Sequence, residues 1–288
     1  MKALIFGAGG QLGTELQRTI PDGVTAKALS SSDCDITDSQ AVHDAISRFS
    51  PDVILNAAAY TAVDQAESEE EAARAVNAAA VGSIADAART SNSRLVHLST
   101  DFVFDGSASK PIKPDAAVSP LGVYGRTKLE GEVAASGAGD GRYVIIRTSW
   151  VYSASGRNFV KTMLALMESR DSLGIVDDQV GAPTWAYGLA EVCWAFAIDR
   201  DVSGVFHWSD AGQLSWYEFA REIQAQGLAF GLLSKPIPLQ LIPSSEYPTP
   251  ARRPAYSVLD SSTTVRELGV EQQDWTQNLN KMMKELVA

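Results

Sequence analysis

Tyr124 and Lys128 lie four residues apart in the segment VYGRTKLEGE, which we interpret as helical. Residues four apart on a helix are neighbours on one face. A phenol has an ordinary pKa of about 10 and needs a nearby positive charge to exchange protons closer to neutrality. The pair therefore predicts a catalytic proton donor with the cation that activates it. The alternative is two polar residues on a solvated face.

Neighbouring residues favour the catalytic interpretation. Ser119 and Pro120 suit the N-cap and the first position of a helix that would carry the pair. Gly125 and Gly131 are poor helix formers and indicate that backbone or ligand approaches this helix closely. Thr100 ends the apolar run RLVHLST, so its hydroxyl should lie at the carboxyl end of a strand, where ligands bind in open α/β sheets.

A glycine-rich turn, GAGGQLG at 7–13, follows the apolar run 2–6 and opens a segment with helical spacing, 11–20. Glycines between a first strand and a first helix let backbone N–H groups face a pyrophosphate. The turn predicts a dinucleotide site, and a tight turn that binds nothing is the alternative. The cofactor-binding residues predicted here are Gly7, Gly10, Gln11, Leu12 and Gly13.

The end of the second expected strand bears on which nicotinamide cofactor is bound. An acid there accepts hydrogen bonds from the ribose hydroxyls and repels a 2′-phosphate, and Ser30 stands in its place. We expect NADPH to be accepted, with NADH as a second candidate, although no arginine is present to hold the 2′-phosphate. Loop residues predicted to contact the cofactor, with ordinary loop positions as the alternative, are Asp35, Ile36, Ala59, Tyr60 and Thr61.

Strands and helices alternate along the first half of the chain. Strands are expected at 2–6, 24–29, 52–56, 94–100 and 143–149, and helices at 11–20, 39–49, 69–90 and around 124–132. Several of the strands are apolar on both faces, which is typical of a parallel sheet covered by helices on both sides. The fold class expected is therefore α/β, a doubly wound parallel sheet. Beyond residue 150 we expect helices near 158–170 and 186–198, a strand near 173–177, and a loop-rich lobe from about 203.

Composition excludes several kinds of partner and chemistry. The net charge of −11 disfavours nucleic acid and anionic membranes. No apolar run reaches the roughly 18 residues of a membrane span, and the N-terminal run is too short for a signal peptide, so the cytoplasm is expected. Cys34 and Cys193 have no metal or redox spacing, the three histidines form no metal pattern, and no GxSxG motif supports a hydrolase.

The chain resembles the extended short-chain dehydrogenase/reductase family over nearly its whole length. The motifs that carry the resemblance are FGAGGQLG, DVILNAAAYTAVDQAE, STDFVFDG, SPLGVYGRTKLEGE, RTSWVY, NFVKTML, DDQVGAPT and YPTPARRPAYSVLD. The last four lie outside the generic nucleotide fold and resemble one subfamily, which reduces the C4 keto group of a dTDP-linked 4-keto-6-deoxy sugar, dTDP-4-dehydro-L-rhamnose, in cell-surface polysaccharide synthesis. The resemblance implies an NAD(P)H-dependent oxidoreductase.

The resemblance also implies roles for single residues. Tyr124 would protonate the sugar O4 as hydride reaches C4, and Lys128 would lower the phenol pKa and bind the nicotinamide ribose. Thr100 would hydrogen-bond the carbonyl oxygen, while Asp101 and Trp150 would border the sugar. Two further polar residues, Asn56 and Asn77, are expected either to have a structural role or to relay protons. The structural role is favoured.

The implied organisation is a Rossmann-like nucleotide domain with a smaller C-terminal substrate-binding lobe. We assign 1–150 to the NAD(P)-binding domain, with 172–200 returning to it, and 151–171 with 201–288 to the lobe. Substrate would bind between them. Arg252 and Arg253 are the clustered cations of the lobe and are shaped for a diphosphate; a solvated basic loop is the alternative. The resemblance implies Mg²⁺, for which no ligands are evident, and a monomer or homodimer.

One residue departs from the subfamily pattern. Phe102 stands after Ser-Thr-Asp where the subfamily commonly has tyrosine, so one hydroxyl is missing from the expected sugar site. Phe102 also argues against the related 4,6-dehydratases, which need a glutamate there to shuttle a proton. Two alternatives stay open: a reductase or epimerase of another nucleotide sugar, and a non-catalytic NAD(P)-binding regulatory subunit. The intact Thr100, Tyr124 and Lys128 argue against the second.

Overall fold

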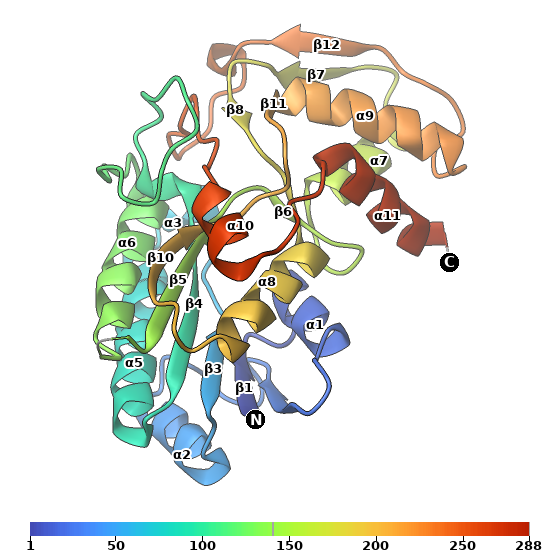
Figure 1. The fold of residues 1–288 in the computed structure, drawn as a ribbon. Helices are drawn as coiled ribbons and strands as arrows, with labels where there is room; N and C mark the ends of the chain where they lie inside the picture. The colour runs from blue at the N-terminus through green and yellow to red at the C-terminus, as the bar shows by residue number, and fades with distance from the viewer. Residues whose placement is uncertain (140, 288) are drawn as a thin grey trace.

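The computed structural model describes residues 1–139 and 141–287. Six strands form one parallel sheet with the order β10-β5-β4-β3-β1-β2. Figure 1 shows this sheet standing upright with the chain's N-terminus at its lower end. The strands are β1 (Lys2–Phe6), β2 (Thr25–Leu29), β3 (Val53–Asn56), β4 (Arg94–Thr100), β5 (Tyr143–Thr148) and β10 (Gly204–His207). The expected doubly wound α/β fold is confirmed.

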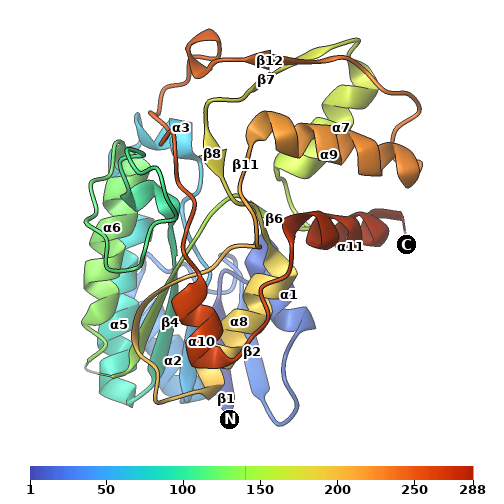
Figure 2. The same cartoon turned by 45° about the horizontal axis from the view of Figure 1, so that its top comes forward.

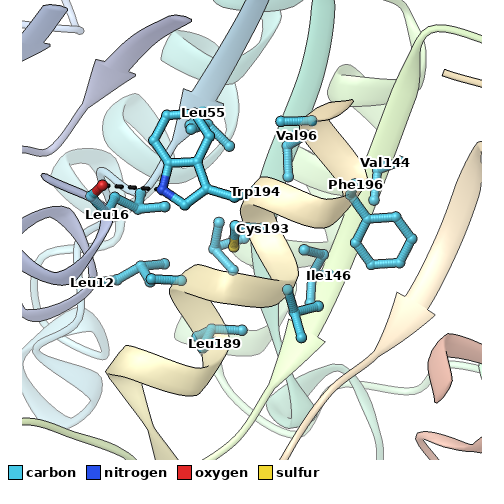
Figure 3. Close-up of a cluster of buried hydrophobic side chains, with 14 of the residues drawn as sticks. Leu12, Leu16, Leu55, Val96, Val144, Ile146, Leu189, Cys193, Trp194 and Phe196 are labelled. Carbon is cyan, nitrogen blue, oxygen red and sulfur yellow. Dashed lines mark hydrogen bonds between the residues drawn. The ribbon is translucent and has the colours of Figure 1, made fainter. Parts of the chain in front are cut away.

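Helices cover both faces of the sheet because its central strands are apolar on both sides. On one face, α1 (Gln11–Arg18) and α8 (Ala186–Ile198) share a core with the strands, and the Trp194 indole N–H donates to the Leu16 carbonyl at 3.0 Å (Figure 3). The Cys193 thiol is buried in this core. On the other face lie α2 (Ser39–Phe49), α5 (Ala80–Ser91) and α6 (Val123–Ser136).

The single helix expected over 69–90 is interrupted. The structure has α4 (Glu70–Arg74), one π-helical turn (Ala75–Ala79) and then α5. Asn77 lies in the π turn, where its amide accepts from the Tyr60 N–H at 2.9 Å and donates to the Tyr60 carbonyl at 3.1 Å. This contact with the loop after β3 depends on tertiary structure, so helical periodicity alone could not reveal it.

The expected N-cap of α6 was wrong. The helix begins at Val123 with Gly122 as its N-cap, whereas Ser119 and Pro120 lie before it in an extended segment. The Val123 N–H donates to the Glu67 carboxylate at 2.8 Å. An acid from a distant segment therefore supplies the helix-start acceptor that we had assigned to a local hydroxyl.

The rest of the chain forms a smaller lobe above the carboxyl ends of the sheet (Figures 1 and 2). Its core joins α7 (Phe159–Ser169), α9 (Trp216–Ala229) and α11 (Trp275–Val287). Its short strands pair as β7 (Leu173–Val176) with β12 (Leu239–Ile242), β6 (Val151–Tyr152) with β9 (Thr184–Trp185), and β8 (Val180–Gly181) with β11 (Leu214–Ser215). Smaller helical segments elsewhere are α3 (Val63–Ala66), Asp101–Val103, Ser244–Glu246 and α10 (Ser262–Leu268).

Two strands belong to a different part of the protein, sheet domain or lobe, from the one that the sequence suggested. β7, expected to return to the sheet, pairs with β12 in the lobe, whereas β10, expected in the lobe, extends the main sheet beside β5. Both are four-residue strands, too short for their composition to indicate a partner. The helix between them, α8, does pack on the sheet as expected.

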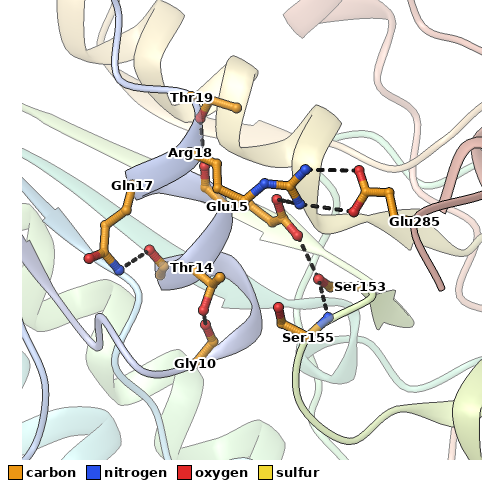
Figure 4. Close-up of polar contacts among 10 residues, drawn as sticks. Gly10, Thr14, Glu15, Gln17, Arg18, Thr19, Ser153, Ser155 and Glu285 are labelled. Carbon is orange, nitrogen blue, oxygen red and sulfur yellow. Dashed lines mark hydrogen bonds and ion pairs between the residues drawn. The ribbon is translucent and has the colours of Figure 1, made fainter. Parts of the chain in front are cut away.

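Polar contacts join the two parts through α1 (Figure 4). The fully buried Glu15 carboxylate accepts from the Ser153 hydroxyl at 2.6 Å and pairs with Arg18 at 2.8 Å. Arg18 in turn pairs with Glu285 of α11 through two hydrogen bonds of 2.9 and 3.0 Å. The first helix after the glycine turn is therefore fixed to the smaller lobe. No helix in the described part of the chain combines the length and apolar character that crossing a membrane requires.

Candidate active site

The glycine turn has the close backbone packing that its sequence predicted. Gly7 has φ +82°, and a Cβ on it would lie 2.5 Å from the Ala58 backbone N. A Cβ on Gly13 would lie 2.1 Å from the Gly7 carbonyl oxygen. Gly10 is the N-cap of α1 and has no side chain to bond the N–H groups of the first turn. These groups can therefore bind an anion at the helix start.

The end of β2 carries a carboxylate that the sequence interpretation missed. The Asp33 carboxylate accepts from the Ser30 N–H at 2.9 Å and from its hydroxyl at 2.5 Å. These bonds hold the pKa of the exposed Asp33 carboxyl below its usual value. The Gly7 and Ala8 N–H groups both donate to the Leu29 carbonyl, which places this acid beside the glycine turn. The Ser-x-x-Asp spacing was the available signal.

The other predicted cofactor residues follow β2 and β3. The Asp35 carboxylate is bonded to the Thr37 N–H and hydroxyl at 2.9 and 2.8 Å, and Ile36 is buried in the core. Tyr60 is fixed by its backbone bonds to Asn77, and its hydroxyl donates to Glu69 at 2.9 Å. Ala59 and Thr61 flank it in the same loop after β3.

Tyr124 and Lys128 lie on the first turns of α6, as predicted. Lys128 is buried, and its ammonium donates to the Leu98 carbonyl of β4 at 2.6 Å. Burial lowers the pKa of Lys128 to about 8, against the opposing charge of Glu132. Burial raises the pKa of Tyr124 to about 12, partly offset by the neighbouring Thr100 hydroxyl. Without cofactor, the phenol pKa is thus shifted upward, opposite to the lowering expected from Lys128.

Thr100, Asp101 and Phe102 lie at the carboxyl end of β4, next to α6. The Thr100 hydroxyl is 3.1 Å from an Asp101 carboxylate oxygen and accepts from the Phe102 N–H at 3.2 Å. Burial raises the pKa of Asp101 to about 6, although Ser257 and Thr100 favour its ionised form. The Phe102 ring meets the Tyr124 ring edge-on, with centroids 5.4 Å apart. The structure therefore brings the predicted hydroxyl, acid and phenol together.

Two neighbouring cavities open between the sheet and the lobe. The one beside Asp101 is small, and it shares Gln179, Trp216 and Arg253 with a cavity of about 400 Å³. The small cavity is lined by Asp101, Phe102, Trp150, Gln179, Trp216, Arg253, Pro254 and Ser257. The larger cavity is lined mainly by apolar residues of α7 and β7, including Phe159 and Met163. Neither Gln179 nor Trp216 was predicted.

Trp150 is held in a constrained conformation at this cavity. Its φ of +48° is uncommon for a residue with a side chain. Its ring stacks on Trp216, with centroids 3.5 Å apart, and a Cβ on Gly181 would lie 2.7 Å from it. Gly181 therefore leaves room for the indole ring of Trp150. Backbone strain such as that of Trp150 is often found at functional sites.

The two predicted arginines have different surroundings. Arg253 lines both cavities, whereas Arg252 is exposed and lines neither. The Arg253 guanidinium binds the Asp64 carboxylate through two hydrogen bonds of 3.0 and 2.8 Å. Asp64 lies on α3, directly after the loop of Tyr60, so this pair also links the two parts of the protein.

Asn56 and Asn77 have structural partners. The Asn56 amide lies 3.1 Å from the ring Nδ1 of the buried His97. Asn77 contacts the Thr127 hydroxyl at 3.3 Å in addition to Tyr60. Burial lowers the pKa of His97 well below its ordinary value, so this histidine is neutral.

Two larger cavities, each of about 700 Å³, lie elsewhere, around Asp210 between α8, α10 and α11. Among the residues that line them, none was predicted for catalysis or binding. We therefore place the site at the smaller cavities, where glycine turn, phenol and lobe converge. Within residues 1–139 and 141–287, no group of three or more His, Cys, Asp or Glu is arranged to hold a metal, so the described residues give no support to the implied Mg²⁺.

The chain is similar to known proteins over its whole length. A family model described as the RmlD substrate binding domain matches residues 1–288. The dTDP-4-dehydrorhamnose reductase of Burkholderia thailandensis is 40% identical, with all of both chains covered. The enzyme of that name from Escherichia coli is also 40% identical, over 99% of this chain and 98% of its own.

Solved structures match equally well. The dTDP-4-dehydrorhamnose reductase of Clostridium acetobutylicum superposes with a TM-score of 0.93, at 38% identity, and all of both chains is covered. The Bacillus anthracis enzyme of the same name, solved in complex with NADP, gives a TM-score of 0.92 at 31% identity over 99% of each chain. A Thermus thermophilus UDP-glucose 4-epimerase in complex with NAD is 16% identical, which shows only a shared fold.

Proposed function

This chain belongs to the dTDP-4-dehydrorhamnose reductase family, and we propose that it reduces the C4 ketone of dTDP-4-dehydro-L-rhamnose with Tyr124 as the proton donor. The observation that carries the proposal is the convergence of Thr100, Asp101, Tyr124 and Lys128 at the carboxyl edge of the sheet, beside the cavities. The chain is an NAD(P)H-dependent oxidoreductase of this family: its full-length relatives are named reductases, and one of them was solved in complex with NADP.

The nicotinamide cofactor supplies the hydride that reaches C4 of the sugar. The chain supplies the proton: the Tyr124 hydroxyl gives it to O4, so the ketone becomes a secondary alcohol and Tyr124 is left as a phenolate that must be reprotonated. Lys128 holds a positive charge one helical turn away, which favours the phenolate after transfer. Burial acts in the opposite direction before transfer: the raised pKa of Tyr124 keeps the proton on the phenol until the substrate is bound.

The first turn of α1 is the proposed pyrophosphate site, with Gly7, Gly10, Gln11, Leu12 and Gly13 around it. The close packing of Gly7 and Gly13 supports this assignment, because side chains at these positions would clash with neighbouring backbone. Their absence keeps the turn tight, so that the N–H groups at the start of α1 can face a pyrophosphate. The adenine half is assigned to Ser30, Asp35 and Ile36, and the nicotinamide half to Ala59, Tyr60 and Thr61. NADPH is the proposed cofactor and NADH the second candidate.

The sugar is assigned to the space beside Asp101 and Trp150, of which the small cavity of about 30 Å³ is only a part, and the nucleotide to the adjoining 400 Å³ cavity. A flat pyrimidine ring suits walls formed by Phe159, Trp216 and apolar side chains. Arg253 lies where the two cavities meet, which suits the diphosphate between sugar and nucleoside. Arg252 would have to reach that position from an exposed site. In this proposal residues 1–150 mainly bind cofactor, and the smaller lobe mainly binds substrate.

The test is the oxidation of NADPH, followed by absorbance, with dTDP-6-deoxy-L-lyxo-4-hexulose as substrate. The Tyr124→Phe variant should lose about 10²- to 10⁴-fold in kcat, the usual contribution of a positioned acid, while NADPH binding persists. Tyr143→Phe is the matched control, since that tyrosine begins β5 at the opposite end of the sheet. Absence of turnover by the wild type would refute the substrate, and full activity of Tyr124→Phe would refute the proton donor.

A second candidate is a reductase or epimerase of another nucleotide sugar. Phe102 favours it, because this residue lines the sugar cavity without the hydroxyl common in the subfamily. Competing dTDP- and UDP-linked 4-keto sugars in the same assay distinguish the two. A regulatory subunit without catalysis would oxidise NADPH with none of them.

A further inference from the structure

The Thr100 hydroxyl is already used within the protein. A hydroxyl has one proton to donate and two lone pairs to accept with. Thr100 Oγ1 accepts from the Phe102 N–H at 3.2 Å and lies 3.1 Å from Asp101 Oδ1. An ionised carboxylate can only accept, so while Asp101 is charged the single proton of Thr100 must point toward it. In that state Thr100 has no proton for a substrate ketone.

Asp101 itself is a buried acid with an unused oxygen. It is 2% exposed, and its Oδ2 has no hydrogen-bond partner among the residues that the structure describes. The carboxyl lines the small cavity together with Trp150 and Arg253. A buried carboxyl with an unpaired oxygen is costly unless a ligand or a proton satisfies it. The group is therefore placed to change state when the cavity is filled.

The charged and polar groups around Asp101 come from helix α6 and from the C-terminal segment 253–257. Tyr124 faces it from α6, where Lys128 and Glu132 follow one and two turns on. Arg253 lines the same cavity from the C-terminal segment, but its guanidinium is paired with Asp64. Ser257 lies beside the carboxyl and favours its ionised form. Burial is the largest influence on Asp101 and favours the neutral acid.

We propose that Asp101 is a positioning residue that must carry a proton for Thr100 to donate to the substrate's ketone oxygen. The proposal rests on the reduction proposed above. The neutral acid donates from Oδ1 to Thr100 Oγ1, which turns the hydroxyl proton of Thr100 outward to the ketone. Oδ2 is then an acceptor for a sugar hydroxyl. Asp101 keeps its proton throughout, and the proton that is transferred comes from Tyr124.

The test is the pH dependence of kcat for NADPH oxidation, in wild type and Asp101→Asn, from about pH 5 to about pH 8.5, which brackets the titration of a buried carboxyl. Wild type should lose activity as Asp101 ionises, at lower pH than any loss from deprotonation of Lys128, whose pKa is about 8. In Asp101→Asn the amide donates to Thr100 at every pH, so that loss should vanish while activity at the acidic end stays within about tenfold of wild type.

Two outcomes would overturn the proposal: the same pH profile in both proteins, or an Asp101→Asn variant that is folded but inactive at every pH. Asp105→Asn is the matched control, because this exposed acid is bonded to Ser107 outside the site and its loss should leave the profile unchanged.

Ser257→Ala provides a test that does not depend on the Asn variant folding. The Ser257 hydroxyl favours ionised Asp101, so its removal should move the loss of activity to higher pH, by about half a unit or more. An unchanged midpoint would also overturn the proposal. If wild type gives no turnover at any pH, the proposed reduction fails, and this result is distinct from turnover whose pH profile is unaffected by Asp101.

Discussion

Burial decides the charge of several acids in this protein, and Asp210 is the clearest example outside the proposed site. It is 2% exposed, and its carboxylate accepts from the Trp185 N–H at 3.1 Å and the Tyr152 hydroxyl at 3.3 Å. Burial nevertheless raises the pKa of Asp210 to about 7. Two hydrogen bonds are therefore too few to replace the water that an ionised carboxylate loses.

A pH-dependent stability follows from Asp210. Its folded pKa lies above the unfolded value of about 3.9, so between about pH 4 and about pH 7 the folded state binds more protons and stability falls as pH rises. In Asp210→Asn this contribution is absent. The free energy of unfolding of the variant, relative to wild type, should rise by about 2 to 4 kcal/mol from pH 4 to pH 8, measured by urea denaturation. A constant difference across this range would contradict the prediction.

The predicted site residues show what a sequence can and cannot indicate. Thr100, Tyr124 and Lys128 were identified because a strand end and a helical spacing fix their positions from local pattern alone. The pairing of Arg253 with Asp64 and the stacking of Trp216 on Trp150 depend on segments far apart in the chain, whereas the contact of Thr100 with its neighbour Asp101 depends on side-chain geometry that residue spacing does not give. No spacing rule links such residues, so their partners could not be predicted.

The contact between α6 and the π turn positions the helix that carries the proposed proton donor, Tyr124. Gly131 is where the two approach: a Cβ there would lie 2.0 Å from the Asn77 carbonyl oxygen. The next residue, Glu132, pairs with Arg147 of β5 at 2.7 Å, and both side chains are buried. The helix is thus fixed on one side by backbone contact and on the other by a buried ion pair, which keeps Tyr124 and Lys128 in register with β4.

Gly131→Ala should force α6 and the π turn apart. Overpacking against rigid backbone typically costs about 1 to 3 kcal/mol of unfolding free energy, and kcat should fall as well because Tyr124 moves with the helix. Gly188→Ala in α8 is the matched control: its Cβ would meet nothing within 4 Å, and it should stabilise by about 0.5 to 1 kcal/mol. Urea denaturation of both variants checks this, and a Gly131→Ala protein as stable as wild type would refute it.

Most helices and strands were predictable because their periodicity is local, and the exceptions have tertiary causes. The helix expected over 69–90 is interrupted where Asn77 binds the Tyr60 backbone, and α6 starts late because Glu67 caps it from another segment. β7 and β10 are short and were assigned to the wrong sheets, since partner choice is set by the assembled lobe rather than by four residues of sequence.

Helix α1 joins the sheet domain to the smaller lobe through side-chain hydrogen bonds. Gln11 at the start of α1 accepts from the Asn158 amide at 2.9 Å, and Asn158 caps α7 through the Lys161 N–H. Helix α7 in turn lines the cavity of about 400 Å³ that we assign to the nucleotide. The Arg253–Asp64 pair adds a second link on the other side of the site. The proposed cofactor and substrate positions are therefore joined by contacts on both sides of the cavities.

The two free thiols, Cys34 and Cys193, are both buried, so the rates at which they react report on opening of the structure. Burial raises the thiol pKa at both Cys34 and Cys193, so neither reacts until structure is lost. Cys193 is packed between α8 and the sheet, so we expect it to become accessible only when α8 separates from the sheet. Cys34 lies in the loop after β2, so we expect a local opening of that loop to expose it. Labelling by a thiol reagent should show a fast phase from Cys34 and a slow one from Cys193, assigned with Cys34→Ser. NADPH should slow the fast phase most, because the loop after β2 belongs to the proposed cofactor site. A single time course would then separate local opening of this loop from global unfolding.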